Sequence, residues 1–161
     1  RGGMLLRIAA ERMLGRTSDA AQHARELAAA RPNDTIALSM HALTSIESGG
    51  DAQQALTTAS RAVQQAEQNT RDRSELTTAL DALGQAQLAT GKIAEAETTF
   101  RRLLGLQSDS AMARLGLAEV FLANGQPAEA RRMVQSAGVT DALKRSPWIQ
   151  TRIDRISQRL P

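Results

Sequence analysis

The sequence predicts an all-α fold of stacked helical hairpins, and three observations support that prediction. Long stretches lack proline and are rich in Ala, Leu, Gln, Glu and Arg, and their apolar residues recur every three or four positions, as in helices. One Trp, two Phe and no Tyr leave small and aliphatic side chains to fill the core, which suits thin layers of packed helices. Glycines interrupt the helical stretches at nearly regular intervals.

Length and composition limit the class of protein. With 161 residues, 42% of them apolar, the chain fits one domain or a short repeat array and is too apolar for a disordered protein. It has no cysteine, which excludes disulfides, thiolate zinc sites and cysteine nucleophiles. No run approaches the ~18 apolar residues of a membrane span, and the start lacks a signal-peptide pattern. Because helical patterning begins almost at the first residue, we expect the chain to be part of a longer protein.

The two clearest helices lie in the middle of the chain. Apolar residues at 76–88 follow the helical period and stop before Gly91, and a second set at 93–104 stops near Gly105. These residues predict two helices joined by a tight turn.

This hairpin repeats along the sequence. Residues 91–96 and 125–130 share the pattern G-x-x-x-E-A at an offset of 34 residues, and Gly15 and Gly50 begin weaker copies upstream. The step from Gly50 to the next copy contains seven extra residues near 70–76. They would either lengthen a helix by about two turns or form a longer polar loop.

The hairpins resemble the tetratricopeptide repeat, a 34-residue helical hairpin with a recurring pattern of large and small residues. In residues 77–110 the matching positions are Leu80, Leu83, Gly84, Gln87, Ala96, Phe100, Leu103 and Ser108, and in 111–144 they are Arg114, Leu117, Ala118, Phe121, Ala130, Val134, Ala137 and Ala142. The small residues Gly84, Ala96, Ala118 and Ala130 are interpreted as packing positions that let helices approach closely.

The resemblance implies an α-solenoid of about four hairpins followed by a capping helix. The approximate repeats are 1–35, 36–69 with an insertion at 70–76, 77–110 and 111–144. Residues 145–161 are expected to form the final helix, which would begin around Ser146, Pro147 and Trp148.

The sequence contains no catalytic or metal-binding pattern. The segment from Gly84 to Lys92 has six residues between its glycines, where a phosphate loop has four, and Ile93 stands in place of the hydroxyl residue. His23 and His41 fall on different hairpins without a local set of metal ligands, so we interpret both as partly exposed helix residues. We therefore expect neither an enzyme nor a bound cofactor or metal.

Charge is concentrated at the C-terminal end. The chain has a net charge of +3, and residues 144–161 contain five basic residues and one acidic residue, so the body lacks the basic stripe of a nucleic-acid-binding protein. Three arginines of the last helix share a face that flanks an isoleucine stripe: Arg152, Arg155 and Arg159, beside Ile149, Ile153 and Ile156. An acidic protein or a membrane surface could dock there, but we favour a solvated outer face on a capping helix.

By resemblance, four positions on the first helix of each repeat line a concave groove. In this chain they are Ala37, Met40, Thr44 and Glu47, then Thr78, Asp81, Gln85 and Leu88, then Met112, Leu115, Glu119 and Leu122. This mixture of apolar and acidic side chains suits an amphipathic helix or an extended peptide. None of the twelve is basic, which argues against the C-terminal carboxylate that chaperone-type repeats hold. The alternative for Leu88, Leu115 and Leu122 is packing between helices.

The leading hypothesis is a non-enzymatic scaffold that binds a peptide or helix of a partner protein in this groove. The Ala-, Arg- and Gln-rich, degenerate repeats look like those of bacterial secretion, exopolysaccharide-export or envelope-assembly systems, which favours the periplasm or envelope over the cytoplasm. Two alternatives remain: a regulatory or nucleic-acid-binding helical repeat, which the few aromatic residues disfavour, and a helper domain of a larger enzyme.

Overall fold

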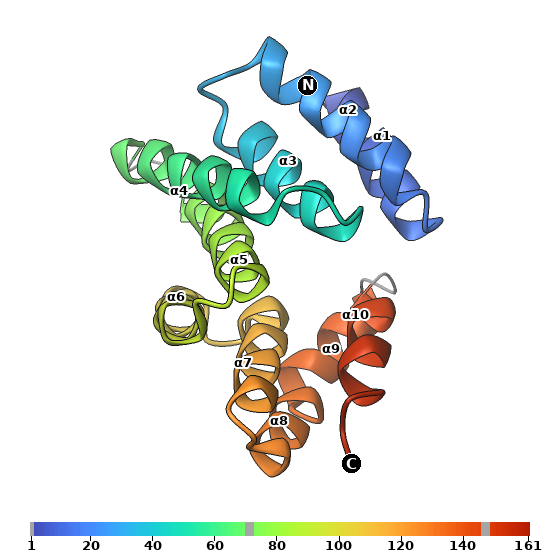
Figure 1. Ribbon diagram of the computed structural model, residues 1–161, viewed down its shortest axis with the longest axis vertical. Coiled ribbons are helices and arrows are strands. Elements are labelled where there is room, and N and C mark those ends of the chain that lie inside the picture. Colours follow the sequence, from blue (N-terminus) through green and yellow to red (C-terminus); the bar gives the residue numbers. More distant parts are fainter. Residues whose placement is uncertain (1, 70–72, 146–148) are drawn as a thin grey trace.

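The computed structural model describes residues 2–69, 73–145 and 149–161, which form ten helices along a curved path (Figure 1). In chain order they are α1 (Gly2–Met13), α2 (Thr17–Ala30), α3 (Thr35–Glu47), α4 (Ala52–Gln68), α5 (Arg73–Ala89), α6 (Ile93–Leu106), α7 (Ala111–Ala123), α8 (Pro127–Val134), α9 (Ala137–Arg145) and α10 (Ile149–Ser157). No strand occurs in these ranges, and each of the first seven helices packs on the next. The predicted all-α solenoid is confirmed.

The first eight helices form four hairpins that share one turn geometry. Each turn has a glycine with φ between 70° and 76°, at Gly15, Gly49, Gly91 and Gly125. The next residue donates its backbone N–H to the carbonyl five residues back at 2.8 Å in all four turns, which ends the first helix in the same way each time. Gly15 and Gly49 are 34 residues apart, as are Gly91 and Gly125, whereas Gly49 and Gly91 are 42 apart.

The turn of the second hairpin therefore lies one residue earlier than the sequence predicts. We expected Gly50 to correspond to Gly91, but Gly49 has the positive φ, and Gly50 precedes Asp51, the N-cap of α4. The Asp51 carboxylate accepts hydrogen bonds from the backbone N–H groups of Gln53 and Gln54 at 2.8 and 3.0 Å. Two adjacent glycines made the register ambiguous in the sequence, and in the structure Gly49 takes the turn conformation while Asp51 caps α4.

The extra residues between the second and third hairpins lie largely in longer helices. α4 and α5 each have 17 residues, whereas α2 and α6 have 14 and α3 and α7 have 13. Of the predicted insertion at 70–76, residues 73–76 belong to the first turn of α5, and 70–72 lie outside the described residues.

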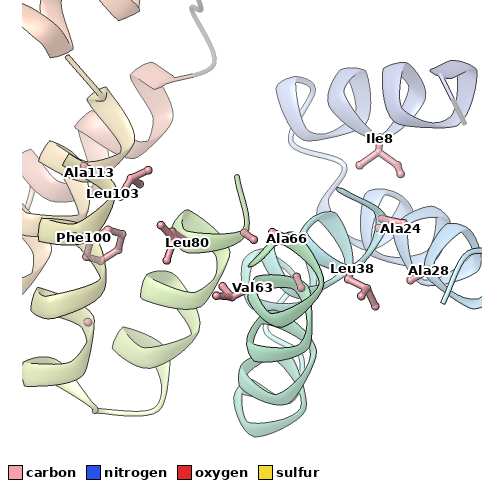
Figure 2. Close-up of a cluster of buried hydrophobic side chains, with 14 of the residues drawn as sticks. Ile8, Ala24, Ala28, Leu38, Val63, Ala66, Leu80, Phe100, Leu103 and Ala113 are labelled. Atoms are coloured by element: carbon pink, nitrogen blue, oxygen red, sulfur yellow. The ribbon is translucent and has the colours of Figure 1, made fainter. Parts of the chain in front are cut away.

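One core runs from hairpin to hairpin and is built mostly from small side chains. Figure 2 shows its members following one another from Ile8 on α1, through Ala24, Leu38 and Val63, to Phe100 on α6. Because alanines fill many of the interior positions, the helices approach closely and each hairpin depends on its neighbours for burial.

Among the described residues Phe100 has the largest fully buried side chain, and two glycines make room for it. Its ring lies between Gly84 on α5 and Gly116 on α7, where an added Cβ would meet the ring of Phe100 in both cases, at 2.5 Å from Cζ for Gly84. The prediction that Gly84 is a packing position is confirmed, and Gly116 has the same role from the following repeat.

The C-terminal end contains one helix more than expected. The fourth hairpin ends early, since α8 has only 8 residues, and the separate helix α9 begins after two intervening residues. Ser136 donates its hydroxyl hydrogen to the carbonyl of Met133 at 2.8 Å at this break. Gly138 then lets α9 approach α7, because a Cβ there would lie 3.0 Å from Nε of Arg114.

α10 follows α9 and packs against both α7 and α9. Its buried residues Ile149 and Ile156 join the core cluster of those helices. The expected start of this helix, Ser146, Pro147 and Trp148, lies outside the described residues.

Candidate functional site

A cavity of about 480 Å³ lies on the concave side of the solenoid. The curvature brings α10 round to the same side as α1 and α3 (Figure 1), and side chains from both ends of the chain line the cavity, together with Asp81 and Gln85 on α5 and Met112 on α7. The first and last helices are thus opposite walls of one site, although they are far apart in sequence.

A buried arginine joins α10 to the groove. Arg152 is 9% exposed, and its terminal nitrogens lie 3.4 Å from Oδ1 of Asp81 and 3.5 Å from Oε2 of Glu119, both of which are buried. With its amide oxygen turned toward the guanidinium, Gln85 accepts hydrogen bonds from both terminal nitrogens at 2.6 and 2.5 Å. Nη1 also lies 3.5 Å from Sδ of Met112. These four residues form a complete receptor for one guanidinium group.

A second ion pair ties α1 to α3 at the other side of the cavity. Arg12 donates from Nη2 to Oε1 of Glu47 at 2.6 Å and from Nε to Oε2 at 2.9 Å, so the pair is bidentate. The side chains are 19% and 25% exposed, which places them at the border of the cavity instead of deep in the core.

The groove residues expected from the sequence fall into two groups. Glu47, Asp81, Gln85 and Met112 line the cavity, and Glu119 lies beside it through its contact with Arg152. The others contribute mainly to packing or lie apart from the cavity lining: Thr44 and Leu115 are fully buried, and Ala37 is nearly so, while Met40, Thr78, Leu88 and Leu122 are partly buried.

Sequence reasoning missed Arg12, Arg152 and the apolar residues of α1 that reach the cavity. For Arg152 a signal was present, because it lies three residues after Ile149 and four before Ile156, and so shares their buried face. The twelve groove positions contain no basic residue, but three arginines enter the cavity from α1 and α10. The argument against an anionic ligand therefore does not apply to the cavity as it is built.

The three tail arginines do not form one exposed face. Arg152 is buried in the groove, Arg155 is exposed and lines the cavity, and Arg159 is exposed and does not line it. α10 is thus a wall of the groove as well as a cap on the last hairpins.

The histidines lie away from this cavity. His23 is close to Glu11, with Nδ1 2.9 Å from Oε2, and Arg7 reaches the same carboxylate at 3.0 Å. Burial raises the pKa of Glu11, but the hydrogen bonds from His23 and Arg7 outweigh it, and the net shift is downward. Within the described ranges no group of three or more His, Asp or Glu side chains could hold a metal ion.

His41 gives the fold a pH dependence of its own. Burial lowers the pKa of this partly buried imidazole, and the positive charge of Arg25 lowers it further, so the folded protein binds a proton less readily than the unfolded chain. The free energy of unfolding should therefore fall as pH drops below about 6.5, by at most about 1.4 kcal/mol per pH unit for one proton.

Urea unfolding between pH 7.5 and 5.0 tests this expectation, since the lowered pKa of Glu11 acts only at more acidic pH. A His41→Asn variant should show a flatter profile than the parent chain over this window. Identical pH profiles for the two proteins would contradict the assignment.

Comparison with known proteins supports the repeat interpretation. Residues 82–139, from the middle of α5 to the start of α9, match the family model of the tetratricopeptide repeat. No curated protein matches the sequence. None of the described helices combines the length and apolar character needed to cross a membrane.

Proposed function

We propose that this chain, whose residues 82–139 match the tetratricopeptide repeat, is an interaction scaffold whose concave cavity binds a segment of a partner protein. Repeats of this family are generally protein–protein interaction modules and are typically not enzymes. The function then depends on the surface that the solenoid presents and not on a reaction.

The observation that carries the proposal is the cavity enclosed by α1, α3, α5, α7 and α10. It combines apolar side chains with charged groups whose positions are held by the contacts of Arg12 and Arg152. Apolar surface supplies binding energy, and fixed polar groups orient the ligand. A helix or an extended segment that inserts a few side chains would use both.

A finer proposal concerns the assembly to which the partner belongs. The Ala-, Arg- and Gln-rich composition and the degenerate first repeats support a place in a bacterial secretion, exopolysaccharide-export or envelope-assembly system. Capture of partners from an envelope fraction, compared with a cytosolic fraction of the same cells, tests this proposal. A partner found only in cytosol would contradict it.

A steric block tests the proposed function without assuming the chemistry of the ligand. Met13 is 60% exposed and lines the cavity, so Met13→Trp should fill space there without disturbing the core. We expect proteins captured from native lysate by the parent chain to be lost with this variant, as measured by quantitative mass spectrometry. Leu106 is 39% exposed and does not line the cavity, which makes Leu106→Trp the matched control. Equal capture by all three proteins would exclude the cavity as the binding site.

A further inference from the structure

One wall of the cavity is unusually apolar for an exposed surface. Among the described residues only four large apolar side chains are exposed, and three of them, Leu6, Met13 and Leu14, belong to α1 or follow it directly. Met13 and Leu14 line the cavity with Leu43 and Ile46 of α3, and these four residues are called the apolar wall. Exposed apolar side chains gathered at a concave site mark a binding surface.

The charges around the cavity are equal in number but uneven in position. Of the described residues, three arginines and two carboxylates line the cavity, and the buried carboxylate of Glu119 lies beside it. Arg12 is paired with Glu47, and Arg152 is held by Asp81 together with Glu119. Arg155 is exposed, lines the cavity and makes no ion pair with any other described residue, so its positive charge can pair with a ligand.

We infer that the cavity takes an acidic amphipathic segment of a partner protein, with large apolar side chains on the apolar wall and a carboxylate toward Arg155. This inference rests on the proposed function and names the chemistry of the partner. The carboxylates of the groove are not available to bind a basic segment, because Arg12 and Arg152 already pair with them inside the chain. A cavity of about 480 Å³ holds several side chains of such a segment but not a whole domain.

Selection from a random library of 15-residue peptides displayed on phage tests the inference with the full chain as bait. Enriched peptides should carry two or more Leu, Ile, Met or Phe residues spaced three or four apart, flanked by Asp or Glu. They should bind poorly to Leu14→Ser and normally to Leu106→Ser, since both leucines are exposed but only Leu14 lines the cavity. A basic consensus, no enrichment, or equal binding to both variants would overturn the inference.

A charge reversal on α10 then tests the second part of the inference, the contact between a carboxylate of the peptide and Arg155. Fluorescence anisotropy of one enriched peptide should show about five- to tenfold weaker binding to Arg155→Glu, through loss of one exposed ion pair and added repulsion. Arg159→Glu makes the same charge change two residues after the end of α10, outside the cavity, and should leave the affinity unchanged. Equal losses for both variants would show that only net charge matters and would overturn the Arg155 assignment.

Two other results separate this inference from the proposed function. A concentration-dependent dimer that is lost in Leu14→Ser would make a second copy of the chain the occupant and overturn the acidic partner. If Met13→Trp abolishes capture of a natural partner but that partner's binding segment is basic, the proposed function stands and the inference alone fails.

Discussion

Phe100→Ala is expected to lower the free energy of unfolding by about 3–5 kcal/mol, the range for removing a buried aromatic ring. The ring is 0% exposed and lies between α5 and α7, so its loss leaves a cavity that three helices border. The helix backbones cannot collapse into this space easily, because the neighbouring repeats hold them on both sides. Urea denaturation followed by circular dichroism measures the change. A loss below about 1 kcal/mol would contradict this placement of Phe100.

The contact with the two glycines can be isolated by a double-mutant cycle. Gly116→Ala alone should be destabilising by about 1–3 kcal/mol, because the new methyl group meets the Phe100 ring. In the Phe100→Ala background the same change should cost little, since the ring is gone and alanine favours helix over glycine. Additive losses in the double variant would show that Gly116 and Phe100 do not contact each other.

The pairing of Phe100 with Gly84 could be predicted, but its pairing with Gly116 could not. The first two residues are matching positions of one repeat, so the 34-residue pattern places them together. Gly116 belongs to the next repeat, where the pattern has no requirement for glycine, and only the packing of α7 on α6 reveals its role. Patterns within a repeat are thus easier to infer than contacts between repeats.

The same distinction explains what the sequence showed of the candidate site. Asp81 and Glu119 are in the predicted groove because each occupies one of the four groove positions on the first helix of its repeat, the fifth for Asp81 and the ninth for Glu119. Their common partner Arg152 is 71 residues from Asp81, and the contact depends on the small rotation between successive repeats, summed over the array. No local sequence pattern reveals this accumulated rotation. The position of α10 over the groove could therefore be found only in the three-dimensional structure.

Arg152→Ala is expected to destabilise the C-terminal helices by about 3 kcal/mol, the lower end of the range for breaking a buried ion pair. The change removes the only cation held between Asp81 and Glu119, as far as the described contacts go, and leaves two buried carboxylates on the groove floor. Arg152→Lys should recover part of the loss, since an ammonium group keeps the charge but not the planar fork that reaches several acceptors.

The stability lost in Arg152→Ala should affect the C-terminal helices before it affects the whole solenoid. Ile149 and Ile156 still anchor α10 in the apolar cluster of α7 and α9, whereas α1 to α6 do not depend on Arg152 for their own core. Hydrogen exchange should therefore become faster in α10 and α9, and remain unchanged in α2 to α4. Exchange that accelerates equally in all helices would mean that the solenoid unfolds as one unit and that the ion pair stabilises the whole array.

The matched control for this change is Arg159→Ala, which removes an exposed arginine from the same end of the chain and should alter stability by less than about 0.5 kcal/mol. If both variants behave alike, the buried position of Arg152 is wrong and α10 is only a solvated cap. If Arg152→Ala alone releases α10, Arg155 loses its place opposite the apolar wall. Peptide affinity should then fall even though no residue of that wall has changed, because the contacts of Arg152 with Asp81 and Glu119 help to hold α10 at the cavity.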